Sequence, residues 1–450
     1  MASPLDRDVA DAILGIDTLW GGDVMNPSGT GRFIADSWFS DEPLPTAYTH
    51  PTAAKVRQTG GVSGKTVDRP AIDAYLDSVD VHGAIQRLGR EAQKLSGLRG
   101  AYMQGLALSL EVMWDLVMEK LEKGAPVPYE RIVVASTGAK PEPSDPTSKR
   151  QQVAQLLAKV GHPSKNAAEL LAAVDAWRRE RMVPSKTIPA LASAFIAELE
   201  ALTLRNVVPH LPAELRAVPR SNIRFLPIQD AWFSGSMNYL GRARKPDGSP
   251  EYEATYEINA SLQISVPEFQ QLVSHEVVPG HVTTSALIQN MFVRGKVGFE
   301  ASVLTMNTRG AALFEGIANN AILMAHGITE IEDLPDDDLR LGVLLALLQD
   351  DAKNQSSYLT WKENVPQKDV AHVLRHEYLC SEERADKLSG AWGRHPLMGR
   401  MYLPAYRAGT EMVARLRREH PAARAIPALF SCEGLVDVVT VQQALGSRPA

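Results

Sequence analysis

Residues 275–281 read His-Glu-Val-Val-Pro-Gly-His, and the interpretation of the whole chain starts from them. An H-E-x-x-H helix places two imidazoles one turn apart, so that both can bind one zinc ion at about 2.0–2.1 Å. The glutamate beside the first histidine then faces the open coordination position, where it can accept a proton from water. This stretch therefore predicts a zinc site with His275 and His281 as ligands and Glu276 as general base.

The spacing of the two histidines departs from that pattern, because they are six residues apart instead of four. At about 100° per residue, an unbroken helix would point their side chains about 240° apart. Pro279 removes the helical hydrogen bond to the carbonyl of His275, and Gly280 tolerates unusual backbone angles. We therefore expect a two-residue bulge, or a helix that restarts at Pro279, to return His281 to the metal.

A catalytic zinc ion needs a third protein ligand besides its water. Glu315 is the best candidate, because it lies in the apolar helical segment 311–318, after His281 in the chain. A carboxylate in such surroundings is unfavourable unless it has a partner. We predict that Glu315 completes the site, the alternative being a surface glutamate on an amphipathic helix.

The segment 275–281 resembles the H-E-x-x-P-G-H signature of a family of uncharacterised bacterial proteins that is similar to the gluzincin zinc metallopeptidases. Members of that family usually continue with E-G-W-A-x-Y, which residues 315–320 match at Glu, Gly and Ala. They also carry a Y-x-x-N strand before the signature, matched by 256–259, and an S-Y-x-x-G segment resembled by 405–409. The order of these segments agrees from roughly residue 220 to the end.

The resemblance implies a zincin-like metallopeptidase fold and roles for three further residues. Tyr406 would donate a hydrogen bond to the oxyanion of the reaction, with Tyr402 and His395 as alternates. Tyr256 and Asn259 would line a groove that binds an extended peptide, although the segment also fits a purely structural strand.

Three residues depart from the family pattern. Val282 replaces the second histidine of a doublet, Ile317 replaces the tryptophan and Asn320 replaces the tyrosine. These replacements predict a different pocket wall and leave the three proposed ligands intact.

Most of the chain has helical periodicity, as over Leu98–Gly124. Short strands are expected at 222–227, 234–240 and 252–264, just before a helix that Ser265 and Glu268 would cap. The sequence predicts a mainly α, two-lobed fold with a small β-sheet before the metal-binding helix. We expect an N-terminal helical region at 1–205 and a metal-binding region at 206–450, integrated into one fold.

His372 and His376 form the strongest rival site, since they are four residues apart on an expected helix and precede Glu377. Arg375 lies between them, and several charged residues follow. This composition favours a solvated or supporting role over a second metal site.

Composition limits the partners and the location. The formal net charge of −6 argues against nucleic acid as the main partner. The first residues lack the features of a signal peptide, and no apolar run reaches the roughly 18 residues of a membrane span. Cys380 and Cys432 are expected to be reduced thiols. We therefore expect a cytoplasmic protein that acts on a peptide or a small amide and does not bind membranes.

These features predict a zinc metallopeptidase or amidohydrolase, with one Zn2+ per chain, that cleaves a peptide or amide bond. Two alternatives stay open. Two histidines and a carboxylate also suit non-haem iron, as in an oxygenase or a lyase. The departures at Val282, Ile317 and Asn320 instead suit a non-catalytic helical protein with a degenerate metal site.

Overall fold

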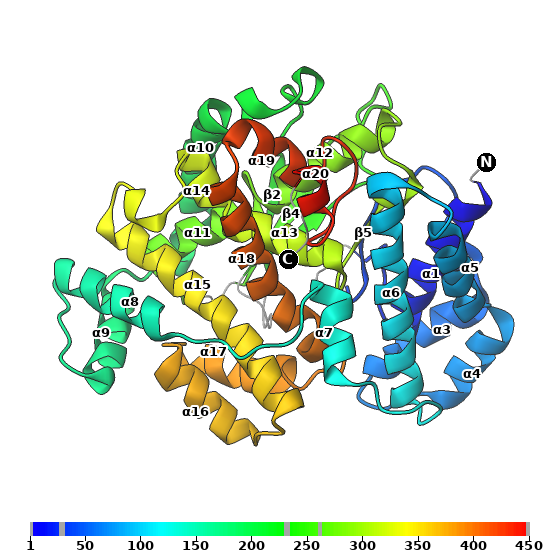
Figure 1. The fold of residues 1–450 in the computed structure, drawn as a ribbon, viewed down its shortest axis with the longest axis horizontal. Helices are drawn as coiled ribbons and strands as arrows, with labels where there is room; N and C mark the ends of the chain where they lie inside the picture. Colours follow the sequence, from blue (N-terminus) through cyan, green and yellow to red (C-terminus); the bar gives the residue numbers. More distant parts are fainter. Residues whose placement is uncertain (1–2, 27–31, 229–234, 260–262, 447–450) are drawn as a thin grey trace.

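The computed structural model describes residues 3–26, 32–228, 235–259 and 263–446. The chain is mainly α-helical, as predicted, and it has two small sheets where the sequence predicted one (Figure 1). The helices of the first half are α1 (Pro4–Leu19), α2 (Thr46–Thr49), α3 (Pro51–Thr59), α4 (Arg69–Ser78), α5 (Val81–Ala92), α6 (Gly97–Lys120), α7 (Tyr129–Thr137), α8 (Thr147–Lys159), α9 (Ala167–Glu180) and α10 (Ile188–Asn206). Those of the second half are α11 (Val266–Glu276), α12 (His281–Val293), α13 (Arg309–Asn319), α14 (Ala321–His326), α15 (Asp337–Ser357), α16 (Gln367–Glu377), α17 (Glu382–Lys387), α18 (Leu403–Glu419), α19 (Ala422–Leu429) and α20 (Val441–Ala444).

The first six helices surround a core of their own at one end of the molecule, seen in blue in Figure 1. Ser3 starts α1 with a capping box, in which Ser3 and Asp6 satisfy each other's backbone amides. The predicted helix over Leu98–Gly124 is α6, which ends at Lys120 shortly before Glu122 adopts a positive φ of 60°.

Two further cores lie beyond this end. The central core is formed by the five helices from α10 through α14, by α18 and α19, and by the larger sheet. The peripheral core is formed by α8, α9, α15 and α16. The long helix α15 borders both, because Val343 packs in the central core and Leu344 in the peripheral one. His275 and His281 lie on helices of the central core.

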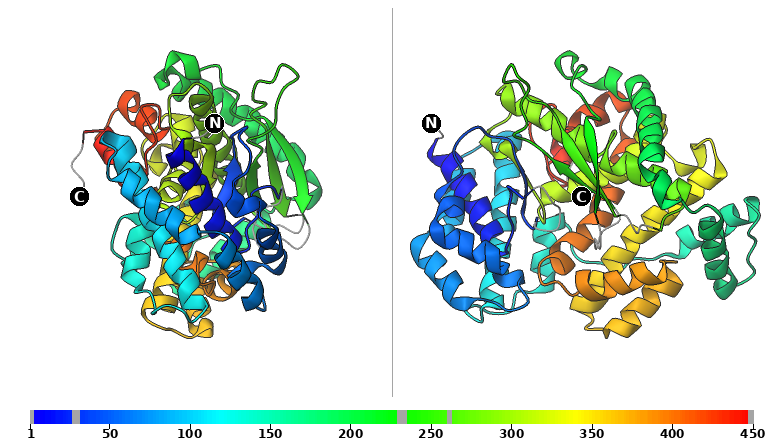
Figure 2. Two further views of the ribbon diagram at one scale, coloured as in Figure 1. Left: turned by 90° about the vertical axis from the view of Figure 1, so that its right-hand side faces the viewer. Right: turned by 180° about the vertical axis from the view of Figure 1, so that it is seen from behind.

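The larger sheet has the strand order β2–β4–β3, formed by Ile223–Ile228, Ala254–Asn259 and Gly235–Tyr239 (Figure 2). β2 runs parallel to β4, and β3 runs antiparallel to it, with Met237 opposite Tyr256. The three strands fall within the predicted strand region; Ser234 and 260–262 lie outside the described residues. β3 is an edge strand of this sheet, and it passes beside α11 and α12.

A second, two-stranded sheet pairs β1 (Ala35–Trp38) with β5 (Val303–Thr305), antiparallel. It joins the N-terminal core to the chain just before α13. A β-bulge interrupts the pairing between Ala35 and Ser37, so that Asp36 is the extra residue of the bulge.

The helical stretch Ser185–His210, which contains α10, is long and apolar enough to cross a membrane by length and composition alone. It is not an uninterrupted apolar run, because Glu198 and Glu200 lie within it. Only 22% of its most apolar window is buried in this fold.

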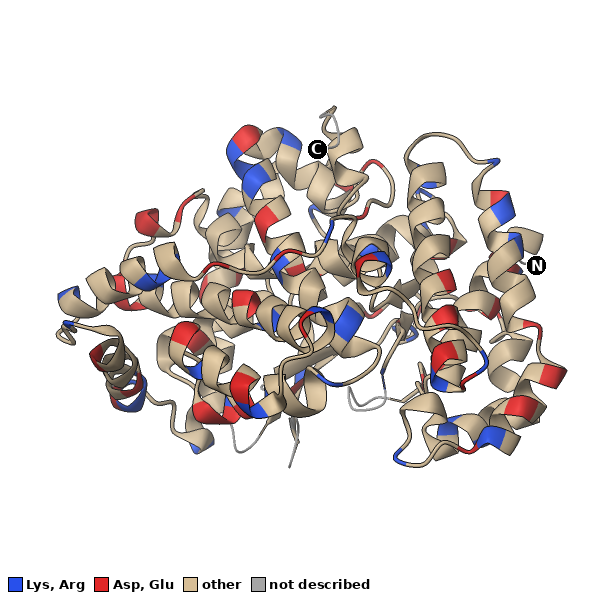
Figure 3. Cartoon of the chain, turned by 60° about the horizontal axis from the view of Figure 1, so that its bottom comes forward, with Lys and Arg blue, Asp and Glu red and all other residues tan. Residues whose placement is uncertain are grey.

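Charged residues of both signs are interspersed along the helices seen in Figure 3. Many are paired, and the pair of Arg99 with Glu300 is bidentate, with N–O distances of 2.7 and 2.9 Å. This pair connects α6 to the segment that precedes β5.

Candidate metal centre

The predicted break in the metal-binding helix is present. Ser265 caps α11 by accepting a hydrogen bond from the Glu268 amide, and the helix ends at Glu276. A new helix, α12, begins at His281, two residues later than the restart predicted at Pro279. A Cβ atom on Gly280 would lie 1.8 Å from the His275 carbonyl oxygen, so only glycine fits this close approach.

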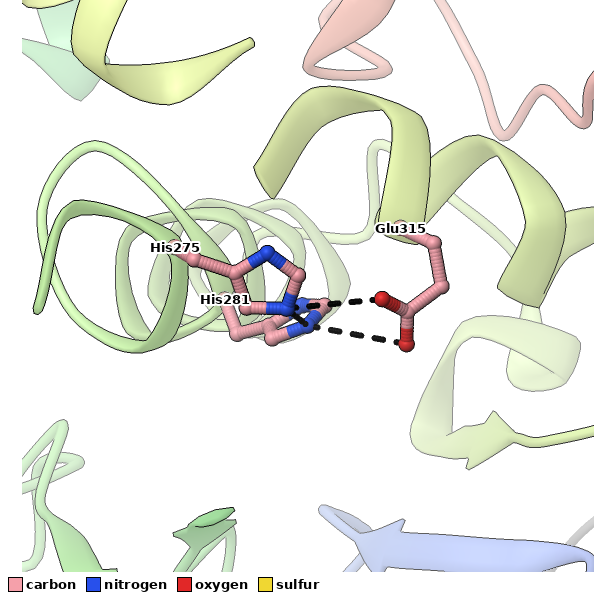
Figure 4. A group of neighbouring side chains, drawn as sticks. All are labelled: His275, His281 and Glu315. Atoms are coloured by element: carbon pink, nitrogen blue, oxygen red, sulfur yellow. Dashed lines mark hydrogen bonds and ion pairs between the residues drawn. The ribbon is translucent and has the colours of Figure 1, made fainter. Parts of the chain in front are cut away.

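His275, His281 and Glu315 converge from three helices, as Figure 4 shows. The two Nε2 atoms are 3.1 Å apart, and they lie 3.4 and 3.8 Å from the nearest oxygens of Glu315. A tetrahedral ion with bonds of about 2.0–2.1 Å separates its donors by about 3.4 Å. Glu315 Oε2 is buried, and it lies 3.4 Å from His275 Nε2. The three side chains therefore fit one tetrahedral metal ion.

The charges of this cluster also suit a cation. Burial raises the pKa of Glu315, but the hydrogen bond from His275 and the charges nearby outweigh it and lower this pKa to about 2. Burial lowers the pKa of His281 to about 4. Burial also acts to lower the pKa of His275, but the carboxylates of Glu315 and Glu276 outweigh this effect, so the pKa of His275 is raised. Glu315 thus favours its charged form and His281 its neutral form, as metal ligands require, whereas the raised pKa of His275 means that its ring would release a proton on binding an ion.

A chain of polar side chains behind His275 fixes the orientation of its ring. The Nδ1 atom lies 2.8 Å from Asn319 Oδ1, and Asn319 Nδ2 donates to Asp350 at 2.7 Å. The Lys353 ammonium is 2.9 Å from the same carboxylate. Sequence reasoning missed this chain, although Asn319 follows Glu315 by one helical turn and so lies on the same face of α13.

Glu276 is held beside the cluster by the edge strand of the larger sheet. The backbone amide of Met237 in β3 donates to Glu276 Oε2 at 3.0 Å. Burial, together with the charge of Glu315, raises the pKa of Glu276 to about 7, against the opposing effect of His275. A general base is most effective when its pKa lies near the working pH.

Tyr402 and Tyr406 lie on the other side of the cluster. The Tyr402 hydroxyl donates to Glu315 Oε1 at 2.5 Å. The two rings are 5.0 Å apart in a T-shaped arrangement, and the Lys353 ammonium sits 3.2 Å above the Tyr406 ring. Tyr402, which the sequence suggested as an alternate oxyanion donor, therefore orients the Glu315 carboxylate, while Tyr406 borders the open space.

Two clefts meet at the cluster, with volumes of about 610 and 130 Å³. Gly235, His275, Glu276 and Tyr406 line both. Asn259 lines the larger cleft. Tyr256, proposed with it as a substrate-binding residue, is fully buried behind Gly235, where a Cβ would lie 3.1 Å from its hydroxyl, and it does not reach the cleft surface.

The remaining sequence candidates lie away from the cluster. His395 stacks on Phe33, and its Nδ1 atom accepts hydrogen bonds from the backbone of Leu397 and Met398. The rings of His372 and His376 are 4.2 Å apart, but they belong to no group of three metal-binding side chains among the described residues.

The departures from the family pattern do not touch the clefts. Val282 and Ile317 are fully buried in the central core. The Asn320 amide donates to the backbone of Gly316 and of Thr410 in α18. The walls of the two clefts are therefore formed by residues other than Val282, Ile317 and Asn320.

Comparisons with known proteins identify relatives of the fold. No model of a known protein family matches the chain, and no curated protein matches it. One similar solved structure is described as a putative lipoprotein from Colwellia psychrerythraea, with 15% identity, a TM-score of 0.53, and coverage of 81% of this chain and 69% of that one. Another is described as a putative lipoprotein of unknown function from Shewanella oneidensis, with 15% identity, a TM-score of 0.52, and coverage of 91% and 80%. At this identity the likeness concerns the fold.

The descriptions of these two structures contradict the prediction of a cytoplasmic protein. Bacterial lipoproteins are membrane-anchored or secreted, and both structures are described as such proteins. The prediction was wrong: it drew on the first residues, the apolar runs and the cysteines, which are local features of the sequence and not of the fold that the chain shares with these structures. Cys380 and Cys432 are both free thiols.

Proposed function

We propose that this protein is a zinc-dependent hydrolase with a zincin-like site that cleaves a peptide or amide bond. The observation that supports it most is the grouping of the two histidine Nε2 atoms, 3.1 Å apart, with the Glu315 carboxylate, whose two oxygens lie 3.4 and 3.8 Å from them, beside the buried Glu276. His275, His281 and Glu315 would hold the metal. When bound, the ion supplies Lewis acidity, which polarises a carbonyl and acidifies water.

Glu276 moves the protons of the reaction. Its carboxylate is fixed by the Met237 amide, and its pKa of about 7 allows it to take a proton from water. The same group, once protonated, can then deliver that proton to the leaving amine, since burial favours its protonated form.

Tyr406 is the proposed donor to the oxyanion. It lines both clefts at the point where they meet, and burial raises its pKa well above the usual value. It therefore stays protonated at neutral pH and can donate a hydrogen bond. The nearby Lys353 ammonium adds positive charge on the same side of the site.

The test combines metal analysis with hydrolysis of a peptide library by the wild type, His281→Ala and Glu276→Gln. We expect about one zinc per chain in the wild type and in Glu276→Gln, and none in His281→Ala. Hydrolysis should fall by about 10²–10⁴ in Glu276→Gln, the usual contribution of a general base. Glu411→Gln, an exposed carboxylate on α18, is the matched control and should remain active.

Two results would contradict the proposal. Absence of metal from the wild type, after zinc has been offered, would favour a structural role for the motif. Bound iron with oxygen-dependent turnover would favour the non-haem enzyme, for which Glu276 has no assigned role.

A further inference from the structure

The two clefts on either side of the cluster differ greatly in size. The larger, at about 610 Å³, lies within the range of about 300–1,000 Å³ that is usual for small-molecule sites. The smaller, at about 130 Å³, falls below that range. A peptide whose reacting bond lies at the cluster can therefore extend on one side only.

The segment around β1 closes the small side. Arg32 donates to the Met237 carbonyl at 2.9 Å, and Ser37 donates to the Tyr239 carbonyl at 2.8 Å. These bonds occupy the outer edge of β3, which an extended peptide would otherwise follow. Gly235, on the other side of Met237, lines both clefts and is the point where the edge of β3 reaches the open space.

The charged groups of the small cleft are Arg32 and Asp36, in addition to Glu276 and the cluster itself. The side chain of Arg32 is 4% exposed, and its guanidinium donates hydrogen bonds to Asp36, Ser236 and the Met237 carbonyl. Its remaining nitrogen, Nε, is buried below the surface of the cleft. The two terminal nitrogens of Arg32 are thus occupied by protein acceptors and its Nε is buried, so Arg32 is not positioned to receive a substrate carboxylate.

Asp36, unlike Arg32, is accessible to a ligand in the small cleft. Its side chain is 20% exposed, and its hydrogen bond from Arg32 ends on Oδ1. The β-bulge between Ala35 and Ser37 takes Asp36 out of the ladder with β5, a device often found beside active sites because it redirects a side chain. The bulge thus presents a carboxylate in the cleft that holds the short end of a peptide.

We propose that the small cleft binds the N-terminal residue of a peptide, with its ammonium group on Asp36, so that the protein removes residues from the amino end. This inference rests on the proposed function, since it assigns the substrate class of the same site. The larger cleft then accommodates the rest of the peptide.

The first test measures binding without turnover. Zinc-loaded Glu276→Gln protein is titrated in a calorimeter with tetra-alanine, with N-acetylated tetra-alanine, and with the C-terminal amide of tetra-alanine. We expect N-acetylation to weaken binding at least tenfold and amidation to have little effect. Adding Asp36→Asn should abolish the difference between the free and acetylated peptides. Asp41→Asn, whose side chain is 80% exposed, should preserve it.

The second test follows the products of wild-type hydrolysis by mass spectrometry, with release of single residues from the amino end expected. Equal binding of free and acetylated peptides, or a tenfold loss on amidation, overturns this inference whatever the hydrolysis assay gives. If the protein binds free tetra-alanine more tightly than the N-acetylated peptide but hydrolyses no peptide, the proposed function is overturned instead. If Asp36→Asn fails to fold because Arg32 loses its partner, the affinities of the three peptides for the Glu276→Gln protein alone test whether a free amino end is required.

Discussion

Asp17 shows how one buried side chain couples stability to pH. Its Oδ1 atom accepts hydrogen bonds from the amides of Ile34 and Ala35, at 2.9 and 3.0 Å, and so fixes the start of β1. Burial raises its pKa from 3.8 to about 7. Between these values the folded protein binds a proton that the unfolded chain has lost. The stabilisation is therefore complete below about pH 4 and is lost as the pH rises through 7.

Asp17→Asn should remove this dependence, because asparagine keeps the accepting oxygen and carries no charge. We expect a variant that is more stable than the wild type at pH 8, by on the order of 2 kcal/mol, with a smaller difference at pH 5. Urea unfolding at both pH values measures the effect, and Asp73→Asn on the surface is the control. The same difference at both pH values would contradict this account.

Asn319 is a positioning residue, since it contacts His275 and not the proposed metal. Asn319→Ala should weaken zinc binding by about 10–100-fold, the usual effect of losing such a partner. Competition with a chelator measures the affinity. Asn320→Ala removes the neighbouring amide, which bonds α18 but not His275, and should lower stability without lowering the affinity. Equal affinities for both variants would mean that the ring of His275 needs no support.

At the scale of elements, the crossing of α13 and α18 places Glu315 beside the two tyrosines. Gly316 and Gly409 allow the helices to touch, since a Cβ on Gly409 would lie 1.7 Å from the Ala312 carbonyl oxygen. A glycine inside a helix is otherwise unfavourable by about 1 kcal/mol relative to alanine. The close approach explains why glycine is present at both positions.

Gly409→Ala should force the two helices apart and move Glu315 away from Tyr402. We expect a loss of stability above about 3 kcal/mol, together with weaker zinc binding, because backbone has to shift. Gly89→Ala in α5 is the matched control, since its Cβ would meet only Ala107, at 3.9 Å. That variant should be as stable as the wild type or more so. Thermal unfolding of both variants measures their stabilities. A Gly409→Ala protein as stable as the wild type would show that α13 and α18 can separate without cost.

At the scale of the whole molecule, the candidate site joins parts of the chain that have separate cores. Arg32 and β1 come from the N-terminal region, α11 to α13 from the central core, and Asp350 and Lys353 from α15. A ligand that binds only the folded state stabilises all of them together.

Zinc should therefore raise the free energy of unfolding, by about 4 kcal/mol when its free concentration is 1,000 times Kd. Denaturant unfolding with and without zinc measures this, and His281→Ala should show no such increase. An equal increase in both proteins would place the bound zinc elsewhere.

Local sequence determined the helical character of the chain, the strand region before the motif, the cap at Ser265 and the break between α11 and α12. Each follows from periodicity, side-chain caps or the backbone chemistry of Pro279 and Gly280, which act within a few residues. The candidate ligands could be named for the same reason, since His275 and His281 belong to one short motif and Glu315 is a charge in an apolar segment.

Only the tertiary structure decided what surrounds them. Arg32 meets the Met237 carbonyl across 205 residues, and Tyr402 meets Glu315 across 87, contacts that leave no periodic trace in the sequence. The inequality of the two clefts and the presence of Asp36 in the smaller one likewise depend on how β1 pairs with β5. Such features arise from packing between distant segments, whereas sequence patterns report forces that act between near neighbours.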